Sequence, residues 1–199
     1  PQAPARLTSG KWERSKFSGV EVMDKTLGLL GFGRIGQLVA QRAQGFGMKI
    51  VAYDPFVGAE RYREMGVEKA ETSDEVYAVA DFITLHTPLT DKTKNVIDAA
   101  AIAKMKDGVR IINCARGGLV DEDALADAIK SGKVGGAGVD VFVTEPAESS
   151  PLFGLPNVVC TPHLGAATTE AQENVALQVA EQMSDYLISC AVSNALNMP

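Results

Sequence analysis

Residues 26–36 read T-L-G-L-L-G-F-G-R-I-G, and this stretch decides the fold. Its first five residues form a short apolar run that is typical of a buried strand. Gly31, Gly33 and Gly36 follow with the spacing G-x-G-x-x-G, and a helical pattern begins at Ile35. In such a unit the first glycine permits a tight turn, and the second lets the backbone approach a pyrophosphate at the helix N-terminus. The stretch therefore predicts a dinucleotide-binding turn.

Strand-like and helix-like segments alternate along nearly the whole chain. Further apolar runs bounded by Gly, Pro or Asp predict strands buried on both faces, at 49–54, 81–86, 109–115, 138–142 and 157–161. A first helix is predicted by the spacing of Ile35, Leu38, Val39, Arg42 and Phe46, and Gly45 and Gly47 end it. A second begins at the acidic residues 121–123 and ends at Gly132. A long final helix is marked by Val175, Val179, Met183 and Tyr186. This alternation predicts an α/β fold with a doubly wound parallel sheet, a Rossmann NAD-binding domain.

The composition excludes several classes of protein. The 199 residues are 46% hydrophobic and 22% charged, which is typical of a globular domain. The net charge of −6 comes without a basic cluster, so we expect no nucleic-acid partner. No apolar run approaches the roughly 18 residues of a membrane span, and the first residues lack the apolar core of a secretory signal. Cys114, Cys160 and Cys190 have no metal-ligand spacing, so we expect no bound metal. We expect the three to be small buried residues with free thiols, which suits a protein of the reducing cytoplasm.

An acidic residue follows the second predicted strand. Asp54 lies 18 positions after Gly36, where a carboxylate can accept hydrogen bonds from an adenosine ribose. Its charge favours NAD over NADP, because it would repel the 2′-phosphate of NADP. The next basic residues, Arg61 and Arg63, lie seven and nine positions further on. The alternative is that the glycines only pack a helix on the sheet and that Asp54 caps a turn.

A nicotinamide cofactor implies hydride transfer, and a hydride added to a ketone leaves an alkoxide that needs a proton from an acid–base group beside it. Histidine suits this task near neutral pH. The chain has His86 and His163, each just past an apolar run. His86 can either shape its turn or contact the cofactor. Glu145 can either orient His163 or lie on a loop surface. Arg116 follows another strand between small residues, in N-C-A-R-G-G, as an arginine that meets a ligand at close range requires.

Several long motifs together resemble one family. G-F-G-R-I-G, Y-D-P, H-T-P-L-T, N-C-A-R-G-G-L-V-D-E, D-V-F-V-T-E-P and P-H-L-G-A-A-T-T-E-A-Q occur in the order seen in D-2-hydroxyacid dehydrogenases. The likeness runs from about Gly10 to the end of the chain and is strongest to members that oxidise 3-phospho-D-glycerate, the first step of phosphorylated L-serine biosynthesis. Glyoxylate/hydroxypyruvate reductase or another D-2-hydroxyacid dehydrogenase, and an NAD-sensing corepressor-like protein, are the alternatives.

The resemblance implies a role for each site residue. Arg116 is expected to bind the substrate's carboxylate and carbonyl oxygen, His163 to be the acid–base group, and Glu145 to hold it. The residues expected around NAD are Gly31, Gly33, Arg34, Ile35, Gly36, Asp54, Thr87, Pro88, Cys114, Ala115, Arg116, Asp140, His163, Gly165 and Ala166. Cys114, His163 and Glu145 are also the residue types of a cysteine hydrolase, but that class has no use for the glycine turn and Asp54.

The resemblance also implies a domain organisation. We expect a lead-in at 1–20, the NAD-binding domain at 21–190 and a return segment at 191–199, with most of the substrate-binding domain absent. Such a chain would bind NAD(H) and a small anionic 2-hydroxy acid but turn substrate over poorly, because closing lobes normally exclude water from the reacting carbons. The family further implies a homodimer formed through the NAD-binding domain.

Overall fold

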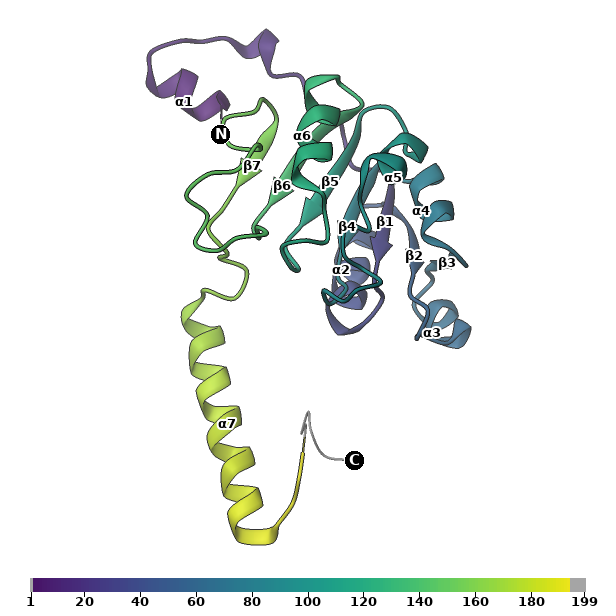
Figure 1. The fold of residues 1–199 in the computed structure, drawn as a ribbon, viewed down its shortest axis with the longest axis vertical. Coiled ribbons are helices and arrows are strands. Elements are labelled where there is room, and N and C mark those ends of the chain that lie inside the picture. The colour runs from purple at the N-terminus through teal and green to yellow at the C-terminus, as the bar shows by residue number, and fades with distance from the viewer. Residues whose placement is uncertain (1, 194–199) are drawn as a thin grey trace. The chain divides into compact units, whose positions relative to one another are not determined.

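The computed structural model describes residues 2–193, which contain a seven-stranded parallel sheet (Figure 1). The strand order is β3-β2-β1-β4-β5-β6-β7. The strands are β1 (Thr26–Leu30), β2 (Lys49–Tyr53), β3 (Glu68–Lys69), β4 (Phe82–Leu85), β5 (Val109–Asn113), β6 (Val134–Val139) and β7 (Val158–Cys160). The helices are α1 (Gln2–Thr8), the 3₁₀ turn η1 (Arg14–Lys16), α2 (Arg34–Gln44), α3 (Ala59–Glu64), α4 (Ser73–Val79), α5 (Ala99–Lys104), α6 (Glu122–Lys130) and α7 (Thr169–Ser189). The predicted α/β doubly wound sheet is confirmed.

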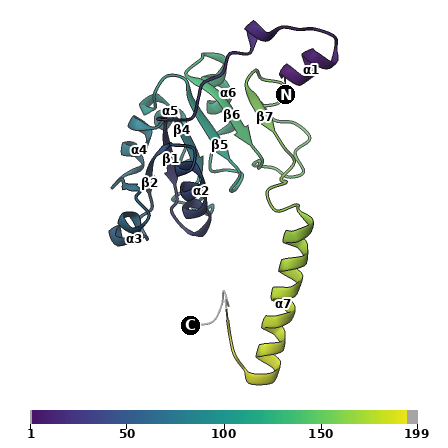
Figure 2. The same cartoon turned by 180° about the vertical axis from the view of Figure 1, so that it is seen from behind.

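Helices cover both faces of the sheet, as the two opposite views show (Figures 1 and 2). The helices α4, α5 and α6 lie on one face, and α2 and α3 lie on the other. Successive residues of a strand point to opposite faces, so each strand contributes to two apolar cores. Leu29 belongs to the core beneath α2 and α3, whereas its neighbour Leu30 belongs to the core beneath α4 to α6. Burial on both faces explains why these strands read as continuous apolar runs.

The chain divides into two compact units, Pro1–Pro162 and His163–Pro199. The first unit contains the whole sheet and the predicted lead-in, where α1 and η1 form. The second contains α7, which begins at the N-cap Thr168, whose hydroxyl accepts a hydrogen bond from the Ala171 amide at 3.1 Å. The long final helix is therefore confirmed. The domain boundaries themselves stay predictions, and residues 194–199 of the return segment lie outside the described part of the chain.

Some details of the predicted elements differ in the structure. The strand at 157–161 is predicted to be buried on both faces, but β7 lies at one edge of the sheet and Val159 is 43% exposed. The predicted helix from Ile35 forms as α2, but Ile35 and Leu38 are exposed and the helix buries its small residues Gly36, Ala40 and Ala43 instead. Small residues allow the helix to lie close to the sheet. Of the larger apolar residues, Val39 packs against the core, whereas Ile35, Leu38 and Phe46 are exposed.

The sixth strand also begins earlier than predicted, at Val134 rather than Gly138. Its sequence V-G-G-A-G-V has few apolar side chains and gives a weak strand signal. Two of the glycines are needed for close approach: a Cβ on Gly135 would lie 2.6 Å from the carbonyl oxygen of Gly108, and one on Gly136 would lie 2.8 Å from that of Asn157. The two-residue β3 gave no signal at all, because it is too short for a repeating pattern.

The cysteines differ from the expectation of small buried residues. All three are free thiols, but Cys114 and Cys190 are exposed and Cys160 is partly buried. Among residues 2–193, no helix is both long and apolar enough to cross a membrane.

Candidate functional site

The site lies where the strand order reverses. The chain leaves β1 for β2 on one side, and β4 begins the run toward β7 on the other. In open parallel sheets, ligands bind beyond the carboxyl ends of the strands at such a switch point. Nine predicted residues occupy loops that follow strands at this edge: Gly31 and Gly33 after β1, Asp54 after β2, Thr87 and Pro88 after β4, Cys114, Ala115 and Arg116 after β5, and Asp140 after β6.

The glycine turn has three differently placed glycines. Gly31 has φ +97°, and a Cβ there would lie 2.6 Å from the carbonyl oxygen of His86. A Cβ on Gly36 would lie 2.3 Å from the carbonyl oxygen of Gly31. A Cβ on Gly33 would meet no atom within 4 Å. Gly31 and Gly36 are therefore required by the packing of the protein itself, whereas Gly33 opens onto space that a ligand can occupy.

The N-terminus of α2 is available to an anion. This helix begins after Gly33 without a side-chain cap, whereas α4, α5 and α6 are each capped by a side-chain oxygen of the N-cap residue. Uncapped N–H groups at the positive end of a helix bind phosphate readily. Arg34 and Ile35, the first two residues of α2, are exposed there.

An unsatisfied hydroxyl lies beside the turn. The Oγ1 of Thr87 is buried and has no hydrogen-bond partner among the described residues. Its methyl group packs close to Gly31, where an added Cβ would lie 2.9 Å away. A buried polar atom without a partner is costly, so a ligand that bonds to it gains affinity. The open space at Gly33, the uncapped helix and this hydroxyl together fit a bound dinucleotide.

Asp54 joins the second strand to the glycine turn. Its Oδ2 accepts a hydrogen bond from the Phe32 amide at 2.8 Å, and its Oδ1 accepts one from the Phe56 amide at 2.9 Å. Arg61 is occupied elsewhere, because its Nε donates to Gln37 Oε1 at 2.9 Å and its Nη1 pairs with Glu64 at 3.0 Å. The position of Asp54 is thus set by the turn, and Arg61 is not held ready for a 2′-phosphate.

His86 serves the turn rather than acid–base chemistry. It follows β4, and its Nε2 lies 3.1 Å from the Oγ1 of Thr84. Burial lowers the pKa of His86 to about 4, so the ring is neutral near pH 7. Its backbone carbonyl lies against Gly31. Of the two interpretations left open by the sequence, shaping the turn is the one that these contacts favour.

The loops that carry Arg116 and Glu145 are locked together. Asn113 closes the turn after β5, since its Oδ1 accepts from the Ala115 amide at 3.1 Å and its Nδ2 donates to the Arg116 carbonyl at 2.9 Å. A Cβ on Gly117 would lie 1.8 Å from the carbonyl oxygen of Phe142, so this position admits only glycine. The Arg116 turn therefore contacts the loop after β6 directly.

Glu145 is fixed within that second loop. Its Oε1 accepts a hydrogen bond from the Phe142 amide at 2.9 Å. Phe142 is therefore the link between the two loops, through its carbonyl on one side and its amide on the other. The Arg116 side chain itself is exposed, with its Nη1 donating to the Ala115 carbonyl at 2.6 Å.

The geometry argues against a cysteine nucleophile. Burial, and then the negative charge of Asp140, raise the pKa of the Cys114 thiol. A nucleophilic cysteine needs the opposite shift, because the thiolate is the reactive form. Asp140 is itself buried and accepts a hydrogen bond from the Thr161 hydroxyl. Cys114 and Asp140 thus belong to the sheet edge, not to a hydrolase triad.

His163, Gly165 and Ala166 begin the second compact unit, directly after the loop that follows β7. His163 has φ 53°, an unusual conformation for a residue other than glycine. The role of these three residues stays a prediction.

Residues that the site needs were missed in the sequence. Asn113, Gly117 and Phe142 order the loops that carry Arg116 and Glu145. Gly117 was singled out only as a small neighbour of Arg116, although its position between two strand ends was a signal for close backbone contact.

Comparison with known proteins agrees with the geometry. Residues 1–165 match the family model of the D-isomer specific 2-hydroxyacid dehydrogenase, NAD binding domain. The chain is 50% identical over 199 residues to D-3-phosphoglycerate dehydrogenase of Methanocaldococcus jannaschii and 48% identical over 199 residues to that of Bacillus subtilis. All of the chain is covered in both comparisons, but it spans only 38% of the length of each of these relatives.

Solved structures with the same fold carry related names. A glyoxylate reductase from Paecilomyes thermophila matches with a TM-score of 0.90 and 34% identity, over 98% of this chain and 58% of that one. The D-lactate dehydrogenase of Escherichia coli matches with a TM-score of 0.82 and 32% identity, over 92% of this chain and 57% of that one. The predicted cofactor, NAD, is confirmed by the family description. The chain therefore belongs to the D-isomer specific 2-hydroxyacid dehydrogenases, as a homologue of D-3-phosphoglycerate dehydrogenase that contains their NAD-binding domain.

Proposed function

We propose that this chain is the cofactor domain of an enzyme that oxidises 3-phospho-D-glycerate to 3-phosphohydroxypyruvate, the first step of phosphorylated L-serine biosynthesis. The names of the curated relatives support the substrate. One observation supports the chemistry above the others. The turn that carries Arg116 is locked through Gly117 and Phe142 to the loop that carries Glu145, at the same sheet edge as the glycine turn.

Each site residue has a proposed task. Arg116 binds the substrate carboxylate through its planar guanidinium, which suits two parallel hydrogen bonds. His163 accepts the proton of the substrate's 2-hydroxyl on an imidazole nitrogen and gives it up in the reverse reaction. Glu145 orients that ring and fixes its tautomer.

The remaining residues hold the cofactor. The amides at the start of α2 and the open face of Gly33 receive the pyrophosphate, and Asp54 accepts from the ribose. The remaining part of the cofactor is surrounded by the Thr87 hydroxyl, Pro88, Cys114, Ala115, Asp140, Gly165 and Ala166. NAD, when bound, supplies the acceptor for the hydride that leaves the substrate carbon.

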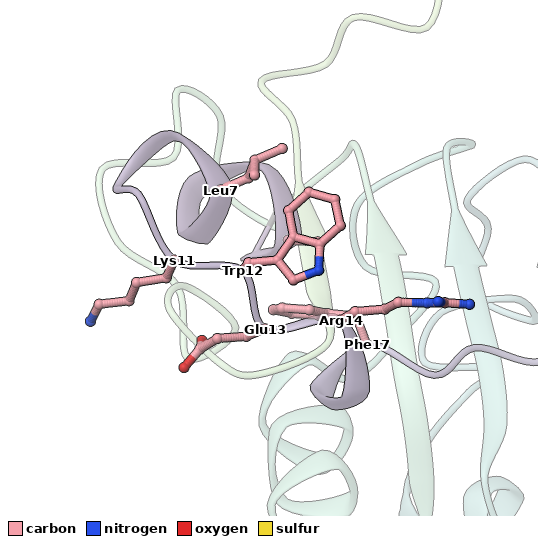
Figure 3. A pocket seen from close by; sticks show the side chains of 7 residues that line it. Leu7, Lys11, Trp12, Glu13, Arg14 and Phe17 are labelled. Atoms are coloured by element: carbon pink, nitrogen blue, oxygen red, sulfur yellow. The ribbon is translucent and has the colours of Figure 1, made fainter.

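A dimer and a cellular location complete the proposal. Trp12 is 82% exposed and lines a pocket of about 260 Å³ together with Leu7 and Phe17. Lys11 and Glu13 also line this pocket, and their charged ends point outward (Figure 3). Apolar side chains such as those of Trp12 and Leu7 are typical of a protein interface, which supports an interface at the lead-in. The homodimer through the NAD-binding domain itself rests on the family resemblance. Three free thiols suit the reducing cytoplasm. Sedimentation that shows a monomer at concentrations where NADH still binds would contradict the dimer.

The full-length parent protein provides the test of function. Its NAD reduction is measured with 3-phosphoglycerate, glycerate and D-lactate in parallel, and we expect 3-phosphoglycerate to be used best. Arg116→Ala should lower kcat/KM on the order of 10²-fold, because about 2–3 kcal/mol of charged hydrogen bonding is lost. The exposed Arg63→Ala is the matched control. Preference for an unphosphorylated acid would favour another dehydrogenase, and NADH binding without any turnover would favour a sensor.

A further inference from the structure

We propose that Glu122 is a positioning residue that holds the Glu145 loop in place. Its Oε1 accepts a hydrogen bond from the Val143 amide at 2.9 Å, and its Oε2 accepts one from the Ser150 hydroxyl at 2.6 Å. Val143 and Ser150 stand on either side of Glu145 in the chain. One carboxylate thus fastens both ends of the segment that carries Glu145. The role in catalysis rests on the function proposed above, whereas the fastening itself does not.

Glu122 is a rigid anchor because α6 is rigid. It is the first residue of this helix, directly after the N-cap Asp121, whose Oδ1 accepts from the Ala124 amide at 3.0 Å. Leu125 and Ile129 bury the same helix in the core against the sheet. A carboxylate in the first turn is further stabilised by the helix dipole. The position of Glu122 is therefore set by the core rather than by the loop that it holds.

The loop has a second, independent support. The carbonyl of Phe142 rests against Gly117, and the amide of Phe142 donates to Glu145. Glu122 binds the next amide along, that of Val143. Consecutive backbone groups are thus held by the Arg116 turn and by α6. The structure thereby fixes the Glu145 carboxylate relative to Arg116, which a reaction needing both groups requires.

Loss of Glu122 should loosen this loop without unfolding the protein. Val143 is 66% exposed, so water can reach its amide when the carboxylate is removed. The apolar side chains of α6 stay buried. The expected defect is therefore in the placement of Glu145, since small displacements of a reacting group are enough to slow a reaction.

The test uses four variants of the full-length enzyme. Glu122→Ala should lower kcat by roughly 10- to 100-fold while the Kd of NADH stays unchanged, because the glycine turn is intact. Glu122→Gln should retain most of the activity, since its amide oxygen can accept from Val143 and its NH₂ group can donate to Ser150. Ser150→Ala removes one of the two bonds and should give an intermediate kcat. Asp123→Ala, an exposed acid in the same first turn, is the matched control and should behave as wild type.

Amide hydrogen exchange measures the fastening without reference to activity. Residues 142–150 should exchange faster in Glu122→Ala than in wild type, and the strands should be unaffected. Unchanged exchange there would overturn the proposal, as would a kcat equal to that of wild type. Equal losses of kcat, NADH affinity and melting temperature would also overturn it, by showing a general structural defect. If wild type itself oxidises no 2-hydroxy acid, the proposed function fails, and the exchange result alone decides whether the loop is fastened.

Discussion

The Asp54 carboxylate and the Phe32 amide are joined by a hydrogen bond of 2.8 Å, which ties the end of β2 to the glycine turn after β1. The predicted ribose ligand is therefore also part of the turn that receives the pyrophosphate. Two parts of the cofactor site that the sequence treats separately are one structural unit.

Replacement of Asp54 should weaken NADH binding more than the loss of a ribose contact alone. We expect Asp54→Ala to raise the Kd of NADH on the order of 10- to 100-fold, because the carboxylate also orders the turn through about 1.5–3 kcal/mol of hydrogen bonding. Fluorescence titration of the chain with NADH measures this. Asp91→Ala, an exposed acid after β4, removes the same charge and should have no effect. Equal affinities of wild type and Asp54→Ala would show that the carboxylate has neither task.

Substitution of Gly117 should be costly. In Gly117→Ala the new Cβ would lie 1.8 Å from a backbone carbonyl, which cannot move aside as the end of a side chain can. We expect a loss of about 1–3 kcal/mol in the free energy of unfolding, measured by urea denaturation. At Gly19 an added Cβ meets nothing within 4 Å, so Gly19→Ala is the control. If both variants are equally stable, the contact with Phe142 is not as close as described.

His86 should make the fold sensitive to mild acid. Its pKa is lowered to about 4 in the folded chain by burial, so an unfolded chain, with a pKa near 6.5, binds a proton that the folded chain does not. The stability contributed by the neutral ring is complete above about pH 6.5 and is lost as the pH falls toward about 4, by about 1–3 kcal/mol.

Urea unfolding at pH values above and inside this window tests that sign. His86→Gln cannot titrate, so its stability should fall less than that of wild type between the two pH values, even if the variant is weaker at both. Parallel pH profiles for the two proteins would mean that His86 titrates normally.

Cofactor should protect Cys114 from alkylation. Cys114 is exposed as a residue next to the predicted cofactor position, but partial burial of its thiol and the charge of Asp140 raise the thiol's pKa. The reactive thiolate is therefore scarce, and modification at neutral pH should be slow. NADH should slow it further at Cys114 and leave the exposed Cys190 unaffected, as peptide mass spectrometry can measure at both sites in one sample. Protection at both cysteines, or at neither, would contradict this position for the cofactor.

Local chemistry determined much of this protein from its sequence. The apolar run before Gly31 and the spacing of the glycines after it are enough to predict strand, turn and helix, because each depends on neighbours in the chain. The acidic residues 121–123 predicted the start of α6 for the same reason, and Asp121 does cap it. The parallel order of the strands follows from the alternation of strands with helices.

Tertiary structure alone decided which loops support one another. Gly117 lies against Phe142, and Glu122 binds the amide of Val143, at sequence separations over which no periodic pattern extends. The same limit applies to α2, where Gly36, Ala40 and Ala43 are buried rather than the larger residues Ile35 and Leu38. The size of an apolar side chain indicates how much its burial would stabilise the fold. Only the distance between the helix and the sheet decides which side chains fit between them.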